Sequence, residues 1–197
     1  MSSPDVTDER SGTRTHVPGE AGLWILICAD LFVFTILFAG FLVDRHDNPA
    51  MFSRSGQELT LAIGVANTLV LLTSSLLVAR FVQRHRAGDP AVGRLALGAI
   101  GCGLLFLVLK VFEWTHLASN DFGPVTDTFF SWYFVLTGLH LVHLLFGLTG
   151  LFVARRVALR RERKEHDGLV VEGIATYWHM VDLLWLVIFP LVYLTAV

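Results

Sequence analysis

Long apolar runs separated by short polar stretches are the main feature of this sequence. A helix of about 20 apolar residues is long enough to cross the hydrocarbon core of a bilayer. Five runs reach that length, and charged or otherwise polar residues bound each of them. The pattern therefore predicts an all-α, polytopic membrane bundle of five transmembrane helices, at about residues 22–43, 59–82, 94–117, 128–154 and 174–197.

Composition agrees with a chain that lies mostly in lipid. Hydrophobic residues make up 54% of it and charged residues only 16%, whereas soluble domains carry about 25% charged residues. Residues 1–20 are polar and lack the apolar core of a signal peptide. We expect a flexible tail over residues 1–20 and one membrane domain over residues 21–197, with no loop long enough for a soluble domain.

Basic residues predict the orientation. Only Arg45 and Arg54 lie on one side of the predicted bundle. The other side carries Arg10, Arg14, Arg80, Arg84, Arg86, Arg94, Arg155, Arg156, Arg160, Arg161, Arg163 and Lys164. The positive-inside rule then places the N-terminus in the cytoplasm and the C-terminus outside. The basic loop before the fifth span suits a topology determinant better than a nucleic-acid patch, so we expect no nucleic-acid partner.

Ionisable residues inside the predicted spans are the candidate functional residues, because a charge at the bilayer centre costs about 2.5–3.5 kcal/mol on insertion scales. A rise of about 1.5 Å per residue places most of them at a similar depth in the cytoplasmic half, where they could form one layer. Glu113 lies in the outer half, and its i,i+3 neighbour Lys110 can neutralise it. The candidates are Asp30, Glu113, His140, His143, His179 and Asp182.

Three roles are open for these residues. Pairs such as Glu113 with His116 have the spacing of metal ligands on helices. Acids and histidines also build proton relays in membrane proteins. The third role is interhelical hydrogen bonding that holds the bundle together and docks a partner, and we favour it. The cysteines, Cys28 and Cys102, suit apolar packing, because they form neither a disulfide framework nor a CxxC site.

Small and aromatic residues suggest where helices meet. Gly147 and Gly150 continue the face of His140 and His143 and permit close approach of another helix. Trp178 and Trp185 share one helix face, which suits packing against a helix or a lipid chain. For the aromatic residues near predicted helix ends we expect anchoring at the membrane interface; these are Trp114, Trp132, Tyr133, Trp178 and Tyr193.

Four segments together resemble a known family. TGLHLVH at 137–143 and YWHMVDLLW at 177–185 are similar to the TGFHGLHV-type and YWHFVDVVW-type segments of cytochrome c oxidase subunit III. FEW at 112–114 resembles that family's aromatic–Glu–aromatic motif, and WILICADLFVF at 24–34 resembles its Ser-Glu segment. The resemblance covers residues 17–197, in the order that the family has. It departs in having Ala29 and Asp30 at the Ser-Glu position and in resembling the short bacterial form without the first two helices.

The resemblance implies a subunit of a respiratory haem–copper oxidase in the cytoplasmic membrane of a bacterium. Such a subunit carries no haem or copper itself, because these lie in the partner catalytic subunit I. It joins subunits I and II, binds phospholipid between its helices, and supports proton uptake and sustained turnover. Asp30 would then take the position of an acid discussed in proton supply, and the other candidates the positions of an internal polar network. The resemblance also fits an accessory protein of bacterial nitric oxide reductase, and a stand-alone transporter or metal enzyme is a third hypothesis.

Overall fold

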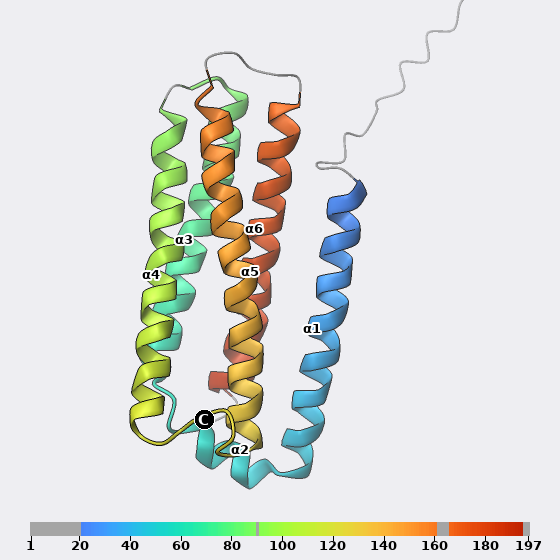
Figure 1. The fold of residues 1–197 in the computed structure, drawn as a ribbon, viewed down its shortest axis with the longest axis vertical. Coiled ribbons are helices and arrows are strands. Elements are labelled where there is room, and N and C mark those ends of the chain that lie inside the picture. The colour runs from blue at the N-terminus through green and yellow to red at the C-terminus, as the bar shows by residue number, and fades with distance from the viewer. Residues whose placement is uncertain (1–20, 90, 161–165, 195–197) are drawn as a thin grey trace, which may run out of the picture.

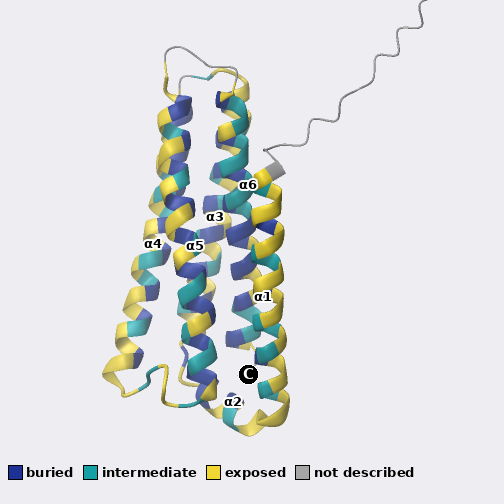
Figure 2. Cartoon of the chain, turned by 45° about the vertical axis from the view of Figure 1, so that its right-hand side comes forward, coloured by how far each residue is buried: buried dark blue, intermediate teal, exposed yellow. Residues whose placement is uncertain are grey.

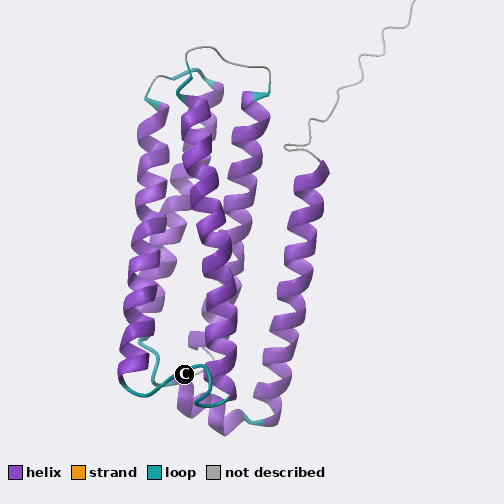
Figure 3. Cartoon of the chain, viewed as in Figure 1, coloured by secondary structure: helices purple, strands orange, loops and turns teal. Residues whose placement is uncertain are grey.

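The computed structural model describes residues 21–89, 91–160 and 166–194, and these residues contain helices and no strands (Figure 3). The helices are α1 (Ala21–Asp47), α2 (Pro49–Gly56), α3 (Leu61–Arg86), α4 (Val92–Ser119), α5 (Thr128–Ala158) and α6 (Asp167–Phe189), and a π-helical turn η1 (Pro190–Leu194) follows. The all-α prediction is confirmed. The predicted tail over residues 1–20 lies outside the described residues.

Five helices are long and apolar enough to cross a membrane, as predicted. Most of them are longer than the sequence pattern indicated: α1 continues to Asp47, α3 to Arg86 and α5 to Ala158. The last helix begins at Asp167, well before the predicted start at residue 174. The apolar runs measure only the hydrocarbon core, whereas the helices continue into the headgroup region, where charged side chains are solvated.

The short helix α2 was not predicted. It has eight residues and begins with Pro49, whose fixed φ suits the first position of a helix. Its Phe52 is buried between Phe41 of α1 and Phe129 of α5, with ring centroids 5.3 and 5.7 Å away. A helix of two turns with a single buried aromatic residue gives too weak a periodicity to be recognised in the sequence.

Helices α3, α4, α5 and α6 pack into one bundle, and α1 lies beside it (Figure 1). Most of α1 is exposed, with buried positions along a single stripe (Figure 2). Ile27, Phe34 and Phe41 form this stripe. The bundle therefore has a continuous core of its own, to which α1 is attached along one edge.

The connections lie at the two ends of the bundle. The α3–α4 and α5–α6 connections share an end with the start of α1, at the top of Figure 1. That end carries the described basic residues Arg80, Arg84, Arg86, Arg94, Arg155, Arg156 and Arg160, while Arg10, Arg14, Arg161, Arg163 and Lys164 lie outside the described residues. The alternation of the spans fits the predicted topology, and its direction across the membrane stays a prediction.

Local polar contacts stabilise both ends. At the basic end, Asp89 accepts hydrogen bonds from the Ala91 backbone N–H (2.8 Å) and from Arg84 (2.7 Å). These contacts hold the pKa of Asp89 below its ordinary value. At the opposite end, the Asp127 carboxylate caps α5 by accepting from the Phe130 backbone N–H at 2.8 Å. The Ser55 hydroxyl also donates a hydrogen bond to the Asp127 carboxylate, which connects α2 to α5.

Candidate functional site

A pocket of about 810 Å³ lies between the first half of α1, the last half of α5 and the first half of α6. Its walls are mostly apolar. They include Leu23 and Leu26 from α1, Phe146 from α5, and Val170 and Ile174 from α6. Because these three segments lie toward the basic end of the bundle, the pocket occupies the half of the membrane that we predict to be cytoplasmic.

One acid–histidine pair lies in the wall of this pocket. Asp30 of α1 and His143 of α5 both line it, and the Asp30 Oδ2 is 3.4 Å from the His143 Nε2. The side chains expose 21% and 13% of their surface, so the pair is partly accessible from the pocket. The Nδ1 of His143 lies 2.8 Å from the Leu139 carbonyl, which fixes the ring in place. The pair joins α1 to the bundle.

A second polar site lies in the other half of the bundle and is closed. Lys110 and Glu113 of α4 expose 0% and 3% of their side chains, with the ammonium 2.8 Å from the carboxylate. This confirms the predicted i,i+3 pairing. The pair is also hydrogen-bonded to two tyrosines. Lys110 donates to the Tyr193 hydroxyl at 2.7 Å and to the Tyr133 hydroxyl at 3.3 Å. Tyr193 in turn donates to Glu113 at 2.7 Å.

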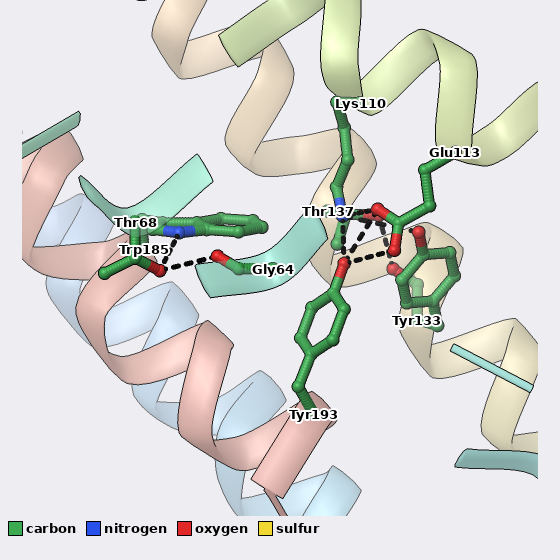
Figure 4. A network of polar contacts seen from close by, with 8 residues as sticks. All are labelled: Gly64, Thr68, Lys110, Glu113, Tyr133, Thr137, Trp185 and Tyr193. Carbon is green, nitrogen blue, oxygen red and sulfur yellow. Dashed lines mark hydrogen bonds and ion pairs between the residues drawn. The ribbon is translucent and has the colours of Figure 1, made fainter. Parts of the chain in front are cut away.

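Figure 4 shows this site, which we call the outer cluster: Lys110, Glu113, Tyr133 and Tyr193. The Lys110 ammonium also lies 4.9 Å from the ring centroids of Tyr133 and Trp185, which adds cation–π attraction. A buried cation is tolerated only when it is paired and hydrogen-bonded. The outer cluster meets that condition with side chains from α4, α5 and η1.

The position of Tyr193 has a local cause. Pro190 lacks a backbone N–H and therefore interrupts the regular helical ladder, and the chain continues from it as the π-helical turn η1. Gly64 of α3 makes room for the Tyr193 ring, because a Cβ there would lie 2.9 Å from it. The backbone change and the missing side chain together let the hydroxyl reach Lys110.

The interface-anchor prediction is wrong for Tyr133, Trp178 and Tyr193, which are buried inside the bundle. In the sequence these residues resemble interface anchors, because they are Tyr and Trp residues near the ends of apolar runs. The bundle instead uses both tyrosines to partner a buried cation. The extension of α6 toward the basic end, beyond the predicted start, also moves Trp178 away from the helix end.

Trp178 and Trp185 are both fully buried and pack against other helices. The Trp178 indole lies against two glycines, since a Cβ on Gly147 would be 2.7 Å from it and a Cβ on Gly103 2.9 Å. Gly150 similarly faces Ile174 of α6, because a Cβ added at Gly150 would lie 3.1 Å from the Ile174 side chain. Gly147 and Gly150 thus form the close-approach surface that the sequence predicted, between α5 and α6.

The remaining candidates belong to neither of these two sites. His140 is buried between the Phe106 and Trp185 rings, with centroids 5.6 and 5.2 Å away. His179 lies near α3, where its Nδ1 is 2.7 Å from the Ser75 hydroxyl. Asp182 is buried with its carboxylate 4.0 Å from the His179 Nδ1. The predicted common layer is therefore divided among different helix pairs.

Metal ligation finds no support in the arrangement of the described residues. No three His, Cys, Asp or Glu side chains in the described ranges come together as metal ligands. Glu113 and His116, which have ligand-type spacing in the sequence, are separated, because Glu113 is buried and His116 is exposed. Lys110 and Glu113 instead pair with each other and with tyrosine hydroxyls, and His179 pairs with the Ser75 hydroxyl.

The fold and these sites define a class of protein: a polytopic helical membrane protein whose internal polar residues join helices. Comparisons with known proteins specify it further, since residues 11–197 match the family described as cytochrome c oxidase subunit III. The chain belongs to this family, which makes it a non-catalytic membrane subunit of a haem–copper oxidase.

Individual relatives agree with this assignment. Cytochrome c oxidase subunit 3 of Synechocystis sp. is 32% identical over 196 residues, covering 91% of this chain and 82% of the relative. The cytochrome bo(3) ubiquinol oxidase subunit 3 of Buchnera aphidicola is 29% identical, with coverages of 89% and 85%. A probable quinol oxidase subunit 3 of Staphylococcus aureus is 27% identical, covering 92% of each. These oxidase names do not favour the nitric oxide reductase alternative.

Proposed function

We propose that this chain docks beside the haem- and copper-bearing subunit I of a bacterial oxidase, in a complex that also contains subunit II. In this arrangement the chain lies in the cytoplasmic membrane with the basic end in the cytoplasm. Electron transfer takes place in the partner subunits, and this chain stabilises the catalytic subunit and supports its proton uptake. The membership of the oxidase subunit III family supports this proposal.

The observation that carries the finer proposal is the pocket between α1, α5 and α6. Its apolar walls suit acyl chains, and His166 at the start of α6 provides a polar group at headgroup level. We propose that a phospholipid occupies it and fills the space between α1 and the bundle. The lipid would then hold α1, and with it Asp30, in place beside His143.

Filling the pocket tests this proposal. Gly22 lines the pocket and has no atom within 4 Å of a built Cβ, so Gly22→Phe adds a ring there without a clash at the Cβ. Gly101 of α4 is equally open but does not line the pocket, which makes Gly101→Phe the matched control. The complex is purified in mild detergent, and phospholipid is measured by mass spectrometry relative to haem.

We expect Gly22→Phe to lower the phospholipid-to-haem ratio and Gly101→Phe to leave it unchanged. An unchanged ratio in Gly22→Phe would refute lipid binding in the pocket. Wild-type chain that purifies without any haem-bearing subunit would refute the docking proposal itself. The two parts of the proposal are thus tested by separate readouts from one preparation.

A further inference from the structure

His179 is unusual among the ionisable residues inside the membrane. It lies inside the predicted span 174–197, about 7.5 Å past the start of that apolar run by the rise of 1.5 Å per residue, and it exposes 41% of its side chain. By contrast, Lys110, Glu113, His140 and Asp182 are buried, and Asp30 and His143 border the pocket. A polar group that faces hydrocarbon at this depth is unfavourable unless a partner satisfies it.

The imidazole cannot turn inward without losing a contact. Its Nδ1 lies 2.7 Å from the Ser75 hydroxyl of α3, and the Asp182 carboxylate is 4.0 Å from the same nitrogen. In the described part of the chain, Nδ1 has this hydrogen bond and Nε2 has none. The bond at Nδ1 therefore leaves Nε2 at the exposed edge of the ring.

The surroundings of His179 are apolar and exposed. Leu183 and Leu186 follow it on the same face of α6 and expose 52% and 42%. Leu72 and Leu76 flank Ser75 on α3 and expose 44% and 51%. These side chains and His179 form what we call the His179 face. It differs from the pocket side, because Tyr177 in the pocket wall is rotated by about 200° around α6 relative to His179.

We propose that the His179 face is the docking surface for a transmembrane helix of the haem-bearing catalytic subunit, and that a polar group of this helix hydrogen-bonds to His179 Nε2. This inference rests on the proposed function. Such a helix provides both apolar contacts for the leucines and one polar group at the depth of His179. Lipid tails offer no hydrogen bond, so a helix that carries a polar group fits this face better than an acyl chain does.

Photo-crosslinking locates the partner. Benzoylphenylalanine is placed at Leu183 on the His179 face and, as a control, at Val108 on the outer side of α4. Both positions are sixteen residues from the start of their helix and are exposed, by 52% and 63%. We expect the Leu183 probe to crosslink to the haem-bearing subunit in the assembled complex, and the Val108 probe not to.

Other crosslinking results would overturn the proposal. An adduct of the Leu183 probe with only lipid or with a second copy of this chain would assign the face to that occupant. Equal adducts from both probes would show that docking is not confined to this face. If the Leu183 variant purifies with haem but gives no adduct, docking at the His179 face is overturned and the proposed function stands. If the wild-type chain purifies without haem, the proposed function is overturned as well.

Two substitutions separate the nitrogens of His179. The amide of Asn reaches the position of Nδ1, so His179→Asn keeps the bond to Ser75 and removes the group at Nε2. The amide of Gln reaches the position of Nε2 instead. We expect His179→Asn to weaken retention of this chain on the complex about three- to tenfold during a detergent titration, the range for an interhelical hydrogen bond in a membrane.

His179→Gln should retain this chain better than His179→Asn, with retention measured as the amount of chain per haem. The thermal unfolding of the separated chain should be unchanged in His179→Asn, since the contact with Ser75 remains. Full retention of His179→Asn, or weaker retention of His179→Gln than of His179→Asn, would overturn the role of Nε2.

Discussion

The outer cluster and the pair Asp30–His143 in the pocket wall, called the pocket pair below, both place an acid beside a base. Their environments are opposite. Lys110 and Glu113 are almost completely buried and share hydrogen bonds with two tyrosines. Asp30 and His143 expose 21% and 13%, lie 3.4 Å apart, and border a pocket of about 810 Å³. The first arrangement connects α4, α5 and η1 rigidly, while the second leaves an accessible pair at a loosely attached helix.

This difference teaches that polarity within a membrane bundle has two uses. A closed cluster contributes to stability only as a complete set, because each member is buried with the others. An open pair borders a pocket on one side, so its removal strands fewer buried groups, and its side chains stay accessible from the pocket. Substitutions should therefore affect assembly at the outer cluster and turnover at the pocket.

The largest effect should come from breaking the outer cluster. Lys110→Met removes the cation and leaves the Glu113 carboxylate buried without its charge partner, although the Tyr193 hydroxyl still donates to it. We expect a loss of about 3–5 kcal/mol in unfolding free energy, the usual result of removing one partner of a buried pair. The yield of the assembled complex and its thermal unfolding in detergent measure this loss.

The double substitution Lys110→Met with Glu113→Gln is the matched control. A neutral Gln can still accept the Tyr193 hydrogen bond and leaves no charge unpaired. Recovery of most of the lost stability in the double variant would confirm that the buried charge causes the defect. If the double variant is no more stable than Lys110→Met alone, the pairing does not explain the stability of this region.

An intermediate effect should distinguish packed from open helix contacts. A methyl group at Gly147 would lie 2.7 Å from the Trp178 ring. That ring also packs closely against Gly103, so it has little room to move away. Gly147→Ala should therefore lower stability by about 1–3 kcal/mol, as overpacking of a core does. At Gly150 the methyl group would meet Ile174 at 3.1 Å, and Ile174 can move into the pocket that it lines.

Gly150→Ala should consequently be milder than Gly147→Ala, and the melting temperatures of the two purified complexes compare them directly. Gly101→Ala provides a baseline, because nothing lies within 4 Å of its added methyl group. Equal losses at Gly147 and Gly150 would mean that the pocket wall is as rigid as the core, and the comparison between the two regions would then fail.

Much of the fold was predictable from the sequence, because a run of apolar residues has one stable arrangement in a bilayer. The Lys110–Glu113 pair was predictable for the same local reason, since i,i+3 residues share a helix face. The parts that were missed depend on contacts between distant segments. Tyr193 reaches Lys110 only through a π-helical turn and a glycine on α3, and neither signals this contact in the local sequence.

The candidate residues were identified because ionisable side chains are unfavourable in lipid. Which of them contact one another could not be predicted from the sequence. Depth along a helix is readable from the sequence, but rotation relative to neighbouring helices depends on packing. His143 therefore joins Asp30 on α1, whereas His179, at a similar predicted depth, turns toward Ser75 on α3. The same limit explains why the outer cluster was recognised as a pair rather than as four residues from three elements.

The smallest effect on stability should come from Asp30→Asn at the pocket. The Asn amide can still form a polar contact with the His143 Nε2, and the position is partly exposed, so we expect a change within about 1 kcal/mol in unfolding free energy. Assembly should remain intact. Oxygen consumption by the purified complex should slow only modestly, because the family resemblance suggests an auxiliary and not an obligatory part for Asp30 in proton supply. Complete loss of oxygen consumption with normal assembly would instead make Asp30 an obligatory donor, and lost assembly would make the pocket pair as structural as the outer cluster.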